Sequence, residues 1–107
     1  MRVVNVRDYG SVTKAELAGV TYVGRPSLLG NPYSHLRHAR GCIFVATREI
    51  AIDKYRRYLY QRLINRDPQI VATLEALKED SVLGCWCVPL ACHASIIAAA
   101  WEWWRKR

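Results

Sequence analysis

The chain has 107 residues, of which 51% are hydrophobic. This balance predicts a single packed domain over residues 1–107 and excludes an intrinsically disordered protein. No apolar run reaches the roughly 20 residues that a membrane-spanning helix needs, and the segment 1–7 is too short and too charged for a signal peptide. We therefore expect a cytoplasmic protein, in which the four cysteines are thiols or metal ligands rather than disulfides.

The formal net charge is +7, and arginine supplies twelve of the sixteen cationic side chains. A guanidinium group grips planar anions such as phosphate or carboxylate with two hydrogen bonds. The charge therefore favours a small anionic ligand or a nucleic acid as the partner, and a solvated basic surface explains it equally well.

The N-terminal part of the chain predicts two strands. Valines and a tyrosine within residues 1–9 indicate the first strand, and the β-branched and aromatic run 20–23 indicates the second. Residues 10–19 are polar and are predicted to form a loop or a hairpin connection. The second strand would then lead directly into a loop rich in glycine and proline.

That loop holds two glycines, two prolines, a serine and an asparagine within residues 24–32. Arg25 follows the strand end, where its guanidinium would clamp an anion, and Ser27 and Asn31 would orient it. The alternative is a tight turn in which Arg25 only pairs with the C-terminal half of the chain. The candidate ligand-binding residues are Gly24, Arg25, Pro26, Ser27, Gly30, Asn31 and Pro32.

A basic segment, 35–40, holds two of the three histidines. His35 and His38 are three residues apart and could share a helix face that binds a metal. Without a third ligand nearby, surface histidines are the simpler interpretation. The apolar run 41–45 then predicts that Cys42 is a small core residue.

Two helices are predicted in the middle of the chain. Thr47 is typical of an N-cap for a helix over 47–65, and Asp67 with Pro68 is typical of the start of a second helix that ends near residue 78. Apolar residues at helical spacing indicate which faces are buried. They are Ala51, Tyr55, Tyr58, Leu59 and Leu63 in the first helix and Ile70, Val71, Leu74 and Leu77 in the second.

The segment 84–93, GCWCVPLACH, concentrates three cysteines and a histidine in ten residues. A short strand over 81–83 leads into it, and a helix over 94–107 follows it. A helix N-terminus offers free N–H groups and the positive end of a dipole, so such a junction is a common place for chemistry. In this last helix Trp103 lies off the buried face, where it is exposed or contacts a second copy in a homo-oligomer.

Three interpretations of this motif stay open. In the first, Cys85, Cys87, Cys92 and His93 carry out covalent or acid–base chemistry, because a thiolate is favoured near a helix N-terminus and arginine. In the second, the same four residues bind a metal, since three thiols and an imidazole match the ligands of zinc. In the third, the cysteines are core residues and His93 caps the last helix.

Two segments together resemble a prokaryotic and phage family known as domain of unknown function 4326. They are Tyr22–Ser27 with Gly30–Pro32, and Gly84–Cys87 with Pro89, Leu90, Cys92 and His93. The resemblance implies a small α/β domain with two motif loops and no activity that can be transferred. The family usually has an acidic residue two positions after the motif histidine, where this chain has Ser95, so a carboxylate that orients the histidine would be replaced by a hydroxyl.

We expect a single α/β domain, a two-layer or three-layer sandwich of Rossmann-like type with a mainly parallel sheet of three or four strands. In such a sheet ligands bind beyond the carboxyl ends of the strands, where both motifs lie. The expected function is binding, and processing by transfer or hydrolysis, of a phosphate-bearing nucleotide or nucleoside-like molecule. The alternative is a zinc-stabilised nucleic-acid-binding module that uses the basic helix from Arg48 to Arg66.

Overall fold

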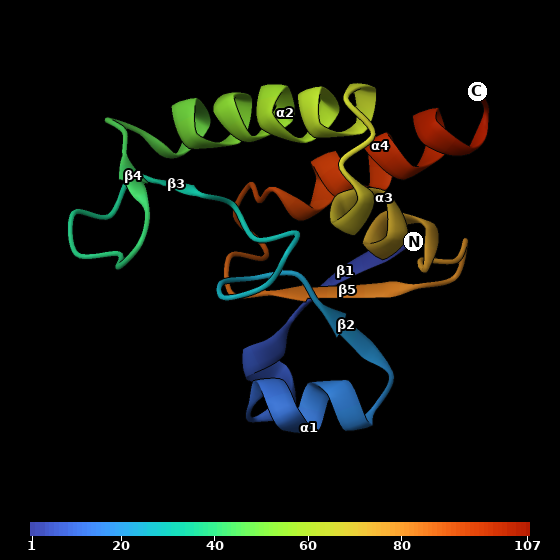
Figure 1. Cartoon of the computed structure of the whole chain (residues 1–107). Coiled ribbons are helices and arrows are strands. Elements are labelled where there is room, and N and C mark those ends of the chain that lie inside the picture. Colours follow the sequence, from blue (N-terminus) through green and yellow to red (C-terminus); the bar gives the residue numbers. More distant parts are fainter.

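The computed structural model describes residues 1–107 and has an α/β fold (Figure 1). It contains four α-helices, one short 3₁₀ helix and five strands. In chain order these are β1 (Arg2–Asn5), η1 (Val6–Tyr9), α1 (Val12–Leu17), β2 (Val20–Tyr22), β3 (Tyr33–Ser34), β4 (Ile43–Phe44), α2 (Arg48–Ile64), α3 (Pro68–Glu75), β5 (Val82–Cys85) and α4 (Ala94–Arg105).

The central sheet has three strands in the order β1-β5-β2, and β5 pairs in parallel with both neighbours. Helix α1 covers one face of this sheet, and α2, α3 and α4 lie over the other face (Figure 1). The strands β3 and β4 form a separate parallel pair beside the N-terminal start of α2. The predicted α/β class and parallel sheet are therefore confirmed, in a three-layer arrangement.

Side chains along β5 alternate between the two faces of the sheet, as extended backbone requires. Leu83 and Cys85 belong to the main core. Val82 packs instead with a smaller cluster between the sheet and α1, which is formed by Val6, Ala15 and Val20. The intervening Gly84 has no room for a side chain, because a Cβ atom there would lie 2.6 Å from a Val20 methyl group. Glycine therefore lets the smaller cluster on the α1 face close on the central strand.

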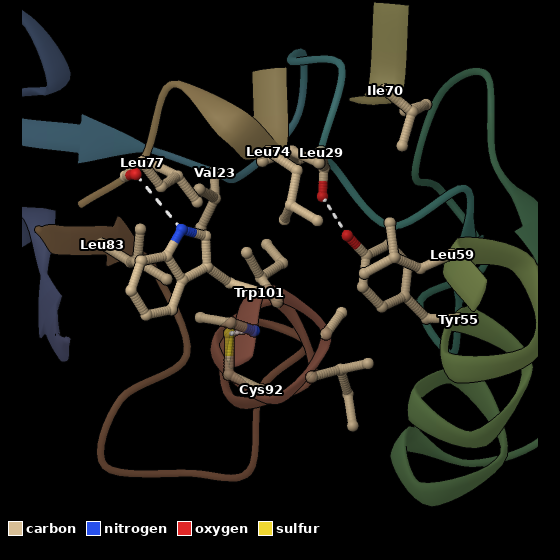
Figure 2. Close-up of a cluster of buried hydrophobic side chains, with 14 of the residues drawn as sticks. Val23, Leu29, Tyr55, Leu59, Ile70, Leu74, Leu77, Leu83, Cys92 and Trp101 are labelled. Carbon is tan, nitrogen blue, oxygen red and sulfur yellow. Dashed lines mark hydrogen bonds between the residues drawn. The ribbon is translucent and has the colours of Figure 1, made fainter. Parts of the chain in front are cut away.

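The main core lies between the sheet and the three helices above it (Figure 2). Two of its aromatic residues keep a polar atom paired inside it. The Trp101 indole N–H donates to the Leu77 carbonyl at 3.1 Å, and the Tyr55 hydroxyl donates to the Leu29 carbonyl at 2.7 Å. These two bonds tie α4 to the end of α3 and α2 to the loop after β2.

Capping residues begin α2 and α3 as predicted. The Thr47 hydroxyl accepts a hydrogen bond from the Ile50 N–H, and the Asp67 carboxylate accepts from the N–H groups of Gln69 and Ile70. Helix α3 ends at Glu75 rather than near residue 78. The Lys78 N–H bonds to the Ser81 hydroxyl at 2.8 Å, and this bond turns the chain towards β5.

Three predictions for the first half of the chain are wrong. Residues 10–19 contain α1, whose N-cap is Ser11, rather than only a loop. The first strand ends at Asn5, because the Asn5 side chain accepts from the Arg7 N–H and begins η1. Cys42 is not a core residue, since it precedes the exposed strand β4 and is only half-buried.

No helix is long and apolar enough to cross a lipid bilayer. Trp103 on α4 is 37% exposed, in agreement with its predicted place off the buried face. Its ring makes an edge contact with Tyr60 of α2, at 5.1 Å between centroids.

Asp67 is expected to stabilise the fold in a pH-dependent way. The Ile70 N–H and the Arg62 guanidinium lower the pKa of the Asp67 carboxylate below its usual 3.8. A group whose pKa is lower in the folded state stabilises the protein above its unfolded pKa, and this contribution is lost as the pH falls below 3.8. We expect Asp67→Asn, which keeps a cap acceptor, to be less stable than the wild type at neutral pH and to match it near the acid limit. Urea unfolding across this range measures the difference, and a constant difference would contradict the expectation.

Candidate functional site

Both sequence motifs lie at the same edge of the central sheet. Because its three strands are parallel, their carboxyl ends at Asn5, Tyr22 and Cys85 lie together. The loop after β2 and the Cys/His segment after β5 meet there and enclose a cavity of about 740 Å³ with the β3 region and the start of α2. The predicted position beyond the strand ends is where this cavity forms.

Three cysteines of the motif converge at this cavity. The Sγ atoms of Cys85, Cys87 and Cys92 all lie within 4.8 Å of one another. The Cys92 thiol donates to Cys85 Sγ at 2.9 Å, and the Ala94 N–H at the start of α4 donates to Cys92 Sγ at 3.5 Å. Cys85 and Cys92 are buried, and Cys87 is half-buried. We call these three residues the thiol cluster.

The thiol cluster favours one negative charge, centred on Cys87. Hydrogen bonds from the Cys85 and Cys92 thiols, together with the Arg48 guanidinium, lower the pKa of Cys87. The bond to Cys87 raises the pKa of Cys85, and the bonds to Cys85 and Cys87, together with burial, raise the pKa of Cys92. A single thiolate is therefore shared between close donors beside an arginine, which is the environment of a reactive or metal-binding cysteine.

His93 is buried immediately before α4. Its Nε2 atom lies 2.6 Å from the Val23 carbonyl oxygen, so Nε2 carries the proton and Nδ1 is the acceptor, 3.5 Å from Cys92 Sγ. Burial lowers the pKa of His93, so the ring is neutral at neutral pH. Tyr55 makes an edge contact with this ring at 5.0 Å. His93 is the N-cap residue of α4, as the third interpretation of the motif predicted, but its side chain makes no cap bond.

Arg25 organises the loop after β2 as well as lining the cavity. Its Nη1 atom donates to the carbonyl oxygens of Asn31 and Tyr33 at 3.0 and 3.2 Å. The Tyr22 hydroxyl donates to the Arg25 carbonyl at 2.6 Å and accepts from the Trp86 indole N–H at 3.1 Å. Tyr22 therefore links the two motif segments to each other.

The candidate ligand-binding residues divide into two groups. Gly24, Arg25, Pro26 and Asn31 line the cavity, whereas Ser27, Gly30 and Pro32 do not. The Asn31 side chain is buried and already bonds to backbone, since Nδ2 donates to the Ala51 carbonyl and Oδ1 accepts from the Tyr33 N–H. In Gly30, a Cβ atom would come within 3.0 Å of the Ser27 carbonyl oxygen. These residues shape the loop around Arg25.

Several residues of the site have no motif that marks them in the sequence. Tyr33, Arg40 and Arg48 line the cavity, and so does His35, which the sequence marked only as a possible metal ligand beside His38. The Asn5 side chain donates to the carbonyl oxygens of Trp86 and Val88 at 3.3 and 2.8 Å, and so holds the Cys/His segment from the end of β1. Arg48 follows the predicted N-cap Thr47, so the sequence predicts its place at a helix start. The sequence does not predict that Arg48 lies beside the Cys/His segment. His38 does not line the cavity.

Comparison with known proteins identifies the family of this chain. The family described as Domain of unknown function (DUF4326) matches residues 6–103, which is most of the sequence. The chain belongs to this family. The match agrees with the resemblance drawn from the two motif segments. In this chain those two segments line one cavity. No curated protein and no solved structure matches the chain.

Proposed function

We propose that the protein binds a phosphate-bearing nucleotide or nucleoside-like small molecule in the cavity between its two motifs, and processes it there. One observation supports this most strongly: three arginines and no acidic residue line the cavity. Arg25, Arg40 and Arg48 supply donors for a planar anion. The volume of about 740 Å³ also lies in the range of small-molecule sites.

The rest of the cavity wall suits the remainder of such a ligand. Tyr33 and Trp86 line it, and aromatic rings of this kind stack on nucleobases. The thiol cluster lies at the same cavity and supplies a thiolate for transfer or hydrolysis. The anion, a planar base and the reactive group would thus be held in one place.

Calorimetric titration with nucleoside monophosphates and diphosphates, with the free nucleosides as controls, tests the proposal. The Arg40 guanidinium takes part in no hydrogen bond or ion pair, and only the Arg40 backbone carbonyl accepts a bond, from the Cys42 thiol. Arg40→Ala is therefore expected to weaken binding at least about tenfold by removing a charge-assisted bond. Arg25→Ala should weaken it further. Arg57→Ala removes an exposed cation of α2 outside the cavity and should have no effect. Equal affinities in all three variants would remove the pocket proposal.

Salt dependence separates this function from nucleic-acid binding. Several exposed arginines lie along α2. Arg62 lies over the Tyr58 ring, and Arg107 at the end of the chain lies over the Trp103 ring. This surface supports the second candidate, a zinc-stabilised nucleic-acid-binding module. A nucleic-acid complex loses affinity steeply with salt through counterion release, whereas a cavity that holds one small anion responds weakly.

Zinc is the cofactor that we propose for the thiol cluster. Cysteine sulfur is a preferred zinc ligand, and Zn–S bonds of about 2.3 Å need sulfurs about 3.8 Å apart. The three Sγ atoms already lie within 4.8 Å of one another, so small side-chain rotations suffice. Free thiols also fit the reducing cytoplasm, which is where we propose that the protein acts.

A further inference from the structure

The thiol cluster supplies three metal-binding atoms and no fourth. It is the only group of three or more histidine, cysteine or acidic side chains in the chain that could hold a metal ion. His93 Nδ1 lies near Cys92 but is not part of that group, and no aspartate or glutamate lines the cavity. A four-coordinate zinc ion held here would therefore have three protein ligands.

The open side of the cluster faces the ligand cavity. All three cysteines line this cavity, and Cys87 is the most accessible of them. Structural zinc sites are closed by four protein ligands, whereas sites with three protein ligands keep a position for water or substrate. Three thiolates leave a zinc site with one net negative charge, and the Arg48 guanidinium, which lines the same cavity, offsets it.

We infer that the metal bound by Cys85, Cys87 and Cys92 keeps one coordination position open towards the cavity, where it binds a water molecule or a donor atom of the ligand. This inference deepens the proposed function and rests on its cavity. It narrows the ligand to a phosphate-bearing molecule that also carries a nitrogen or oxygen donor able to reach the metal while the arginines hold the phosphate. The metal would then act on the ligand directly and would not only stabilise the fold.

Cobalt substitution tests the open position without any nucleotide. The full-length chain is freed of metal, loaded with Co²⁺ and titrated with cyanide, a small ligand that has no phosphate. We expect a thiolate-to-cobalt charge-transfer band, and a saturable shift of the visible d–d bands with cyanide while that band persists. An unchanged d–d spectrum, or cobalt released to free cyanide complexes, overturns the inference by showing a closed or weak site.

Variants identify the ligands in this experiment. Cys87→Ser is expected to lose most of the charge-transfer band, and Cys42→Ser, which alters the thiol outside the cluster, should leave both spectrum and cyanide response unchanged. His93→Gln is expected to retain the cyanide response, whereas a response that appears only in this variant would make His93 the fourth ligand and overturn the inference. Cyanide does not use the arginines, so failure of the nucleotide titration leaves this result unaffected.

Discussion

Replacing Asn31 with leucine is expected to lower the free energy of unfolding by about 2–6 kcal/mol. The Asn31 side chain is 7% exposed and serves two backbone groups, the Tyr33 N–H at 2.9 Å and the Ala51 carbonyl at 3.2 Å. Leucine has a similar size but pairs with neither group. Each buried backbone group left without a partner costs about 1–3 kcal/mol. Urea unfolding monitored by tryptophan fluorescence measures the loss.

The same substitution should also disturb the ligand cavity. Arg25 is held by the carbonyl oxygens of Asn31 and Tyr33, which lie in the segment that the Asn31 side chain fixes. Nucleotide affinity is therefore expected to fall together with stability. Ser27→Ala is the matched control, because Ser27 is exposed in the same loop and lies outside the cavity, and its effect should stay within about 0.5 kcal/mol. A leucine variant as stable as the wild type would show that the loop does not depend on these bonds.

Local signals in the sequence were sufficient to predict the long helices. Thr47 and the Asp67–Pro68 pair act within one helical turn, and the buried stripes of α2 and α4 repeat over several turns. Helix α1 was missed because it has six residues and buries only Ala15, so it shows no periodic stripe. Cys42 was misplaced because an apolar run does not distinguish a buried strand from the exposed strand β4.

The candidate site was predictable in outline, because parallel strands bring segments that follow them to one edge of a sheet. The contacts that support the site could not be predicted from the sequence. Asn5 bonds to Val88 across 83 positions of the chain, and Arg48 reaches Ala91 across 43, and no local pattern reports such pairs. The side chain of Asn31 could equally have faced a ligand or backbone, and only the fold shows that it bonds to backbone.

Protein purified without chelator is expected to contain about one equivalent of zinc per chain, and Cys87→Ser to lose it. Loss of a residue that only hydrogen-bonds to a metal ligand already weakens metal affinity about 10–100-fold, so loss of one of three thiolates should weaken it by more than about 100-fold. Elemental mass spectrometry of both proteins measures the metal content. Cys42→Ser is the control, since this thiol lies outside the cluster and should leave the zinc content unchanged.

Chelation then decides whether the thiols act as ligands or only fill the core. Metal that binds the folded chain and not the unfolded one adds its binding free energy to stability, so removing zinc should lower the melting temperature of the wild type and leave that of Cys87→Ser unchanged. Cys85 and Cys92 belong to the main core in either case, so their burial alone cannot separate the two roles. Four titratable thiols, no zinc and no response to chelator would exclude a metal site and leave thiol chemistry or core packing. The reactive group of the cavity would then be the Cys87 thiolate rather than a metal ion.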